Sequence, residues 1–170
     1  MLEVIDEFRP DLVTNHSIET ALSLVRLYDL HHNPKEPVDI GLLLESFELR
    51  FEEDLPDTTW GFTLDLNHRI IITINANLST ELARYVAVHE IGHVSCWHPN
   101  QLHACVQGKV LYDTMETEAS TVAAYILVPR EAVTGPPLSR KAAVVLAARY
   151  KVPPELVAIR QQLFYLTGGF

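Results

Sequence analysis

The chain has 170 residues, of which 48% are hydrophobic, which is enough for the buried core of one domain with a small helical appendage. Its formal net charge of -9 disfavours direct binding to nucleic acid or to an anionic membrane surface. There are only 2 cysteines, no apolar run is long enough to span a bilayer, and the N-terminus MLEVIDEFRPDL is unlike a signal peptide. We therefore expect a cytoplasmic protein, not a disulfide-rich secreted domain or a membrane protein.

Two helices are predicted in the first third of the chain. In residues 17–30 the apolar side chains recur at helical spacing behind Ser17, a residue type suited to an N-cap. In residues 40–47, IGLLLESF, the apolar side chains again fall on one helical face. The stretches HHNPKEP and EEDLPDTTWG contain prolines and charges and are expected to end these helices.

A β-hairpin and a long helix are predicted next. Residues 61–66 and 69–75 are rich in β-branched and aromatic side chains and are separated by a short polar turn. Ser79 then provides an N-cap for a helix in which apolar side chains follow at steps of three and four. His89 and His93 continue that buried stripe, so the helix carries two imidazoles on its apolar face.

The C-terminal part of the chain is predicted to be helical. One helix covers residues 114–129, and the Gly135-Pro136-Pro137 stretch after it marks the end of a main domain over residues 1–135. Residues 136–170 are expected to form a helical subdomain packed on that domain. Its two helices meet near Lys151, which gives the pair a helix-turn-helix character.

The sequence VHEIGH places His89 and His93 four residues apart on the predicted helix. Side chains at this spacing point the same way, so both imidazoles can bind one metal ion. Glu90 is rotated by about 100° from His89 on a helix. Its carboxylate would lie beside the ion, where it can take a proton from water and pass it to a leaving amine. The competing interpretation is a buried helix whose polar groups are satisfied locally.

A catalytic zinc site has three protein ligands, so one more residue is required. A histidine at the spacing found in metzincins is excluded, because Pro99 stands at that position. The alternative is a glutamate from the following helix. Glu118 is the candidate, since Ala119 beside it would let the two helices approach closely. Glu116 competes with Glu118, but the two lie about 200° apart around a helix, so only one can face the site.

Other histidines and a cysteine lie near the motif. His98 and His103 are candidates to line the site and steady an oxyanion, and the alternative is that they are ordinary polar neighbours. Cys96 lies one turn after His93 and is expected to be a small buried thiol rather than a ligand. The remaining histidines are expected to be structural or exposed: His16, His31, His32 and His68.

Taken together, these residues resemble the ImmA/IrrE family of metallopeptidases over residues 38–166. The similar stretches include IITINANLS at residues 71–79 and VAVHEIGH at residues 86–93. The most specific is EASTVAAYILVP at residues 118–129, which is similar to the family's E-A-x-x-F-A-x-x-L-L-M-P helix. The departures from that pattern remove no candidate ligand; they are Ser120, Val122 and Val128.

The resemblance implies an α+β fold of the zincin type, in which a small antiparallel or mixed sheet packs on helices. It implies a site with Glu90 as general base and acid and with these metal ligands: His89, His93 and Glu118. The metal would be Zn²⁺, which two imidazoles and one carboxylate suit, with Mn²⁺ as the alternative. In zincins a sheet-edge strand holds the substrate. By position that is residues 70–75, with Asn75 as a contact, unless this is an ordinary core strand.

The resemblance also implies a substrate class, the helix-turn-helix transcriptional repressors of phage, mobile-element or stress-response systems. The leading hypothesis is a zinc endopeptidase that cleaves such a repressor at a specific site. One alternative is a non-catalytic anti-repressor or antitoxin-like binding module that retains the metal site. Another is a DNA-binding regulator that uses residues 139–166, where basic side chains outnumber acidic ones. Because the whole chain is acidic, direct DNA binding is not expected and a helical cap is the preferred interpretation.

Overall fold

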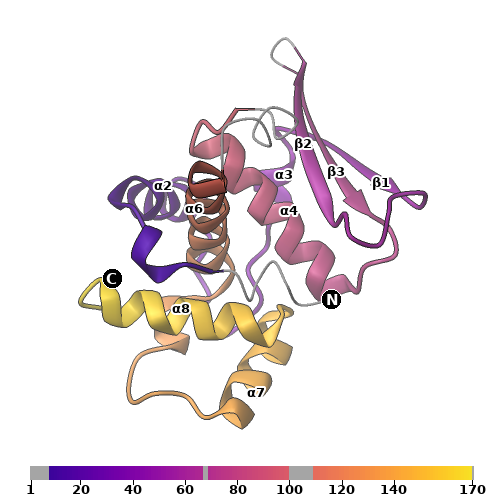
Figure 1. Ribbon diagram of the computed structural model, residues 1–170. Helices are drawn as coiled ribbons and strands as arrows, with labels where there is room; N and C mark the ends of the chain where they lie inside the picture. The colour runs from indigo at the N-terminus through magenta and orange to yellow at the C-terminus, as the bar shows by residue number, and fades with distance from the viewer. Residues whose placement is uncertain (1–7, 67–68, 100–108, 170) are drawn as a thin grey trace.

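Figure 1 shows the computed structural model, which describes residues 8–66, 69–99 and 109–169. A small sheet lies on one side of the long helix α4 (Thr80–Ser95), and helix α6 (Lys109–Leu127) lies on the other side. Helix α2 (Asn15–Leu27) and helix α8 (Pro154–Leu166) both pack on α6. The predicted α+β class is confirmed.

The sequence predicted that Ser17 would begin the first helix. Helix α2 instead begins after Thr14. The Thr14 hydroxyl accepts a hydrogen bond from the backbone N–H of Ser17 at 3.2 Å, which is the arrangement of an N-cap. A short 3-10 helix, η1 (Pro10–Leu12), leads into this cap. Ser17 lies in the first turn, where its hydroxyl donates to the Thr14 carbonyl at 2.9 Å. Both residue types suit a cap, so the sequence alone placed the start one turn late.

The second predicted helix is shorter than residues 40–47. Helix α3 covers only Gly41–Leu44, and the chain then forms strand β1 (Glu48–Glu52), which the sequence did not predict. Strand β1 pairs in parallel with β3 (Arg69–Asn75). Parallel neighbours are not joined by a tight turn, so no turn signal in the local sequence marks this pairing.

The predicted hairpin is confirmed, because β2 (Gly61–Leu66) pairs antiparallel with β3. The order of the sheet is β1-β3-β2, so β3 is the central strand and β2 is an edge strand. The expectation that residues 70–75 form a substrate-binding edge is therefore wrong. Both sides of β3 are already hydrogen bonded to neighbouring strands.

Helix α4 begins as predicted, with the Ser79 hydroxyl accepting from the Leu82 backbone N–H at 3.3 Å. The helix is buried on all sides over residues 85–93 and not along a single stripe, because the sheet and α6 cover opposite faces. Gly92 allows the close approach of α6. A Cβ at Gly92 would lie 2.9 Å from both the Cα and the carbonyl oxygen of Ala119.

The C-terminal helices form as predicted. A 3-10 helix, η2 (Arg130–Ala132), leads from α6 towards α7 (Arg140–Tyr150), and α7 is followed by α8. Helix α8 carries Arg160, whose side chain is buried against α6. The domain boundary near residue 135 stays a prediction. Among the described residues, no helix has the length and apolar character needed to cross a bilayer.

Candidate active site

Three polar side chains lie buried in the middle of α4. His89, Glu90 and His93 are 5%, 3% and 4% exposed. The spacing of four residues points both imidazoles the same way, as predicted, and their Nε2 atoms lie 3.0 Å apart. Glu90 faces the sheet instead, where the hydroxyl of Thr63 on β2 donates to its carboxylate at 2.8 Å. The histidines and the glutamate therefore meet different neighbours.

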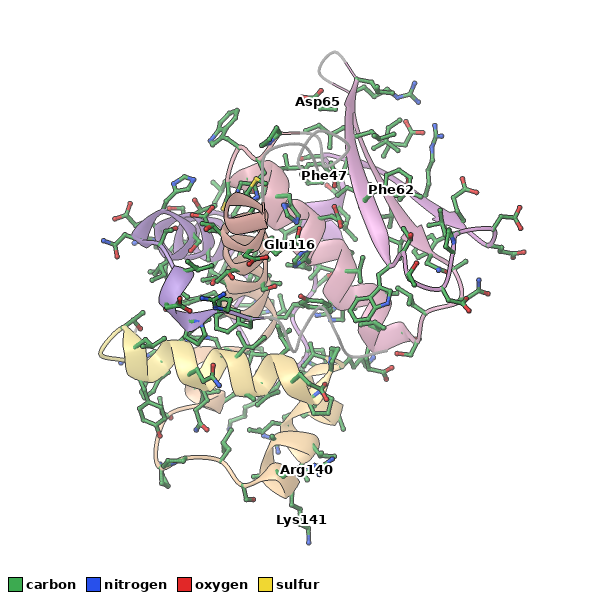
Figure 2. The ribbon with its side chains drawn as sticks, viewed as in Figure 1. Phe47, Phe62, Asp65, Glu116, Arg140 and Lys141 are labelled. Atoms are coloured by element: carbon green, nitrogen blue, oxygen red, sulfur yellow. The ribbon has the colours of Figure 1, made fainter. Side chains whose placement is uncertain are left out.

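Glu116 of α6 completes a cluster with the two histidines. Its carboxylate oxygens lie 3.1 Å from Nε2 of His89 and 3.4 Å from Nε2 of His93. Figure 2 shows Glu116 between α6 and α4. The sequence-based expectation that Glu118 faces the two histidines is therefore wrong, because Glu116 occupies that place. Glu118 instead accepts a hydrogen bond from His98 at 2.8 Å.

The geometry of this cluster fits a divalent metal ion. Its ligand atoms, one each from His89, His93 and Glu116, all lie within 4.8 Å of one another. A tetrahedral zinc ion with bonds of 2.0 to 2.1 Å needs ligand atoms about 3.3 to 3.4 Å apart. Here the two Nε2 atoms lie 3.0 Å apart, Oε2 of Glu116 lies 3.1 Å from that of His89, and Oε1 lies 3.4 Å from that of His93. Two imidazoles and one carboxylate are also a donor set of catalytic zinc sites, which keep a fourth position open.

Two hydroxyl groups contact His89 at Nδ1, the ring nitrogen that does not face Glu116. Its Nδ1 lies 3.2 Å from the Tyr85 hydroxyl and 3.3 Å from Oγ of Ser120. The two hydroxyls are themselves 3.1 Å apart. A hydroxyl can donate or accept, so these contacts fix the position of the ring without fixing which nitrogen carries a proton. The opposite nitrogen, Nε2, faces Glu116.

The imidazole of His98 contacts His93 at Nδ1, the ring nitrogen that does not face Glu116. Nδ1 of His93 lies 2.8 Å from Nδ1 of His98, and Nε2 of His98 lies 2.8 Å from the carboxylate of Glu118. The Thr14 hydroxyl donates to the other oxygen of that carboxylate. Both ring nitrogens of His98 are therefore engaged within the protein. This leaves no N–H for the oxyanion role that the sequence suggested for His98.

The environment of Glu90 suits proton transfer. Burial raises the pKa of its carboxyl group to about 7, although the nearby charge of His89 and the hydrogen bond from Thr63 oppose this shift. Gly61 makes room for α4, because a Cβ there would lie only 2.6 Å from Cγ1 of Val86. The same Cβ would lie at an ordinary contact distance of 3.7 Å from Oε1 of Glu90. A group with a pKa near neutral can both accept and release a proton at physiological pH.

Glu116 and the two imidazoles shift one another's pKa values. Burial lowers the pKa of His89, but the carboxylate of Glu116 outweighs this effect, so the net shift is upward. Burial, together with the charge on His89, lowers the pKa of His93 to about 4 even though Glu116 opposes it. Burial raises the pKa of Glu116, but the nearby imidazoles of His89 and His93 reverse the shift and hold it well below the usual range. A ligating imidazole nitrogen must be unprotonated, so a metal ion bound to Nε2 of His89 would compete with protons for that nitrogen.

A cavity of about 250 Å³ opens beside His93. The sheet contributes part of its wall and the end of α4 contributes the rest, with these lining residues: Thr63, Asp65, Ile70, His93, Val94, Trp97, His98 and Pro99. His98 thus lines the site, as predicted. Asn75 does not, because its side chain is buried and donates to the Thr59 carbonyl at 3.0 Å. His103 lies outside the described residues, so its role stays a prediction.

Several supporting residues were not predicted. Tyr85 lies one turn before His89 and Ser120 one turn after Glu116, so helical spacing was a signal that could have revealed both. Thr63 comes from a distant strand, and no local pattern links it to Glu90. Cys96 is 6% exposed and is the buried thiol that the sequence predicted.

Comparison with known proteins gives the family. No curated protein matches the chain. A family model described as the IrrE N-terminal-like domain, a peptidase family, matches residues 48–161. The matched part runs from β1 into α8 and includes the two histidines, Glu90 and Glu116, whereas Thr14 precedes it. The predicted resemblance to ImmA/IrrE proteins is confirmed, and the chain belongs to the IrrE N-terminal-like family of peptidases.

Proposed function

We propose that the protein is a zinc-dependent endopeptidase whose metal ligands are His89, His93 and Glu116. The observation that carries this proposal is the convergence of these three ligand atoms beside the buried Glu90, in a member of a peptidase family. A bound zinc ion would supply a Lewis acid that polarises the scissile carbonyl and lowers the pKa of water. Glu116 takes the place that the sequence gave to Glu118.

Glu90 is the proposed general base and general acid. Thr63 holds its carboxylate by a hydrogen bond of 2.8 Å, so the group is oriented before a substrate arrives. Glu90 takes a proton from the attacking water and then returns it to the amine that leaves. Its pKa of about 7 allows transfer in both directions near neutral pH.

Strand β2 is the proposed binding site for the substrate backbone. It is an edge strand, and its residue Thr63 contacts Glu90. The same strand contributes Thr63 and Asp65 to the cavity beside His93. A peptide that adds to this edge would be held in extended form, with alternate side chains towards the site. The substrate segment must therefore be able to leave any helix in which it is folded.

The proposed substrate is a helix-turn-helix transcriptional repressor, cut at one site so that transcription is released. Support for this class comes from the likeness of VAVHEIGH and EASTVAAYILVP to the ImmA/IrrE metallopeptidases. Direct contact with DNA is not part of the proposal, because the chain has a formal net charge of -9. The DNA-binding partner is then the substrate itself.

The test is a cleavage assay with a helix-turn-helix repressor encoded near this protein. Zinc-loaded wild type is incubated with the repressor, and fragments are identified by mass spectrometry beside the Glu90→Gln and Glu116→Ala variants. We expect one cleavage site with wild type and none with either variant. Elemental analysis should find about one zinc per chain in wild type and in Glu90→Gln, as expected for a site with three ligands. Equal cleavage by Glu90→Gln would reject the assigned chemistry.

The anti-repressor interpretation predicts a different result from the same assay. Helix α7 exposes the apolar side chains of Val144 and Val145, which are 47% and 55% accessible and could contact a partner protein. On this interpretation the repressor forms a stable complex without fragments, and relief of repression survives Glu90→Gln. Fragments that depend on Glu90 would reject it.

A further inference from the structure

A continuous hydrogen-bonded chain runs away from the proposed metal site on the His93 side. It passes from Nδ1 of His93 to Nδ1 of His98 at 2.8 Å, and from Nε2 of His98 to the carboxylate of Glu118 at 2.8 Å. Thr14 donates its hydroxyl proton to the same carboxylate. The side chains of His98 and Glu118 are 6% and 11% exposed, so little water competes for these bonds. The chain joins three segments that are distant in sequence.

The direction of each hydrogen bond follows from the carboxylate at the end. Glu118 accepts a hydrogen bond from Thr14 and, when ionised, can only accept, so Nε2 of His98 must carry a proton. With its one proton on Nε2, the neutral tautomer of His98 has a bare Nδ1, which accepts the proton of His93 Nδ1 at 2.8 Å. His93 is left with a lone pair on Nε2, the nitrogen that faces His89 and Glu116. This is the tautomer that a metal ligand requires.

The end of α4 is built to bring His98 back to His93. Trp97 follows the C-cap Cys96 with a left-handed backbone, φ 61°, and the His98 backbone N–H donates to the His93 carbonyl at 3.0 Å. This is the turn with which many helices end, but glycine normally occupies its left-handed position. The Trp97 side chain is 86% exposed, so packing of the indole does not explain the strained conformation. The turn does place the His98 ring 5.0 Å from the His93 ring.

We infer that His98 and Glu118 are a positioning dyad for His93, and that Thr14 braces the dyad from outside the family domain. The dyad holds Nδ1 of His93 in the protonated form and so directs Nε2 to the metal. Among the described residues, Nδ1 of His89 instead contacts the hydroxyls of Tyr85 and Ser120, and those groups do not choose a tautomer. The inference rests on the proposed function, because it needs His93 to be a metal ligand. It also assigns a role to Glu118 that is not ligation.

The inference is tested by zinc affinity and by the protonation of His93. His98→Phe keeps the volume of a ring but removes both nitrogens, and Glu118→Gln keeps the shape but removes the charge. His31→Phe is the matched control, because His31 is also a partly buried imidazole that contacts α6, through the Ile126 carbonyl at 2.9 Å. The dissociation constant for zinc is measured by chelator competition. Imidazole nitrogen NMR of the metal-free protein shows which nitrogen of His93 carries the proton.

We expect zinc binding to weaken about 10- to 100-fold in His98→Phe and about 10-fold in Glu118→Gln, the range found for residues that orient metal ligands. His31→Phe should bind zinc as wild type does. The NMR signal of protonated Nδ1 on His93 should be present in wild type and should give way to protonated Nε2 in His98→Phe. Thr14→Val should weaken zinc binding slightly, while Thr14→Ser, which keeps the hydroxyl, should not.

Two results separate failure of the dyad from failure of the metal site. If wild type binds zinc tightly and both dyad variants bind it equally well with His93 unchanged, the dyad is wrong and the proposed function stands. If wild type binds no zinc, the proposed metal site is wrong, and His98 and Glu118 have no metal ligand to position. If His98→Phe does not fold, Glu118→Gln decides, because its near-identical shape leaves packing intact and unaltered zinc affinity there would overturn the inference.

Discussion

Helix α8 and the α4–α6 interface each bury titratable side chains, and these two regions compensate the burial differently. Beneath α8, the guanidinium of Arg160 stacks 4.0 Å from the centre of the Tyr125 ring and its Nε donates to the Val128 carbonyl at 3.3 Å. Between α4 and α6, two imidazole nitrogens and a carboxylate converge on one point, within 4.8 Å of one another. In the first region, other groups of the protein compensate the charge of Arg160. In the second region, the two imidazoles and the carboxylate can each offer a lone pair to a cation.

The difference shows which region is complete without a ligand. A buried cation is stabilised by an aromatic face and by a carbonyl oxygen, so the surroundings of Arg160 already oppose its desolvation. Lone pairs that face one another gain nothing until a cation lies between them. In the metal-free protein burial lowers the pKa of His89, but the carboxylate of Glu116 outweighs this and so favours a proton at this point. Added zinc should therefore stabilise the α4–α6 region and leave the region beneath α8 unchanged.

The largest expected effect is the loss of zinc from Glu116→Ala. Removal of one of three ligands should weaken binding about 1000-fold, which is equivalent to about 4 kcal/mol. Glu118→Ala should lose less, about 10- to 100-fold, because Glu118 acts through His98. Chelator competition on both folded variants measures the difference. A larger loss of zinc affinity in Glu118→Ala than in Glu116→Ala would indicate that Glu118 is the ligand. The proposed difference between the two regions would then be wrong.

Arg160→Ala should have its effect on stability and not on metal binding. Arg160 is 2% exposed, and the truncation leaves a cavity over Tyr125 and removes a donor from the Val128 carbonyl. We expect the free energy of unfolding to fall by about 3 kcal/mol. Arg160→Met is the control, because it refills most of the volume and should lose clearly less. Chemical denaturation measures both variants, and a change in the zinc affinity of folded Arg160→Ala would show that the regions are coupled.

The pH dependence of metal-free stability should reveal Glu90. Burial raises its folded pKa from the ordinary value of 4.5 to about 7, so between these pH values the folded protein binds more protons than the unfolded chain. This part of the stability is complete below pH 4.5 and is lost as the pH rises through 7. The loss amounts to about 3 kcal/mol at most, at 1.36 kcal/mol for each pKa unit.

The Glu90→Gln variant isolates this contribution, because glutamine does not titrate. The free energy of unfolding of the variant, relative to wild type, should rise between the two ends of this pH range. Glu116 contributes in the opposite direction, since its pKa is held low, but it is present in both proteins and cancels in the difference. If the free energies of unfolding of the two proteins change with pH in parallel, burial does not raise the pKa of Glu90.

The sequence predicted the part of this site that lies within one helix. The spacing of His89 and His93 fixes their relative direction, and the offset of Glu90 follows from the same geometry. The choice between Glu116 and Glu118 depends on how α6 is rotated about its axis, which is set where its backbone meets Gly92. That contact joins two helices, and no periodicity within either helix encodes it.

The same limit applies to the sheet. The β2–β3 hairpin was predicted because its strands are adjacent in sequence and rich in β-branched residues. Strand β1 was missed because its parallel partner, β3, is reached only after β2 has intervened. The order of strands then decides which one has a free edge. Residues 70–75 lie in the central strand for that reason, and the proposed substrate-binding edge is β2.

The smallest expected effect concerns the ends of two helices, one in each region. Trp97 ends α4 with φ 61°, and Lys151 ends α7 with φ 53°, so both are non-glycine residues in the left-handed conformation. Replacing either by glycine should raise the stability of the metal-free protein by about 1 kcal/mol, because the steric cost at Cβ is removed. Thermal denaturation of Trp97→Gly and Lys151→Gly measures the two gains. Zinc affinity should stay unchanged in Lys151→Gly and fall slightly in Trp97→Gly, since a freer turn positions His98 less firmly. A Trp97→Gly variant less stable than wild type would show that the indole makes stabilising contacts despite its 86% exposure. The left-handed backbone of Trp97 would then be explained by those contacts and not by the placement of His98.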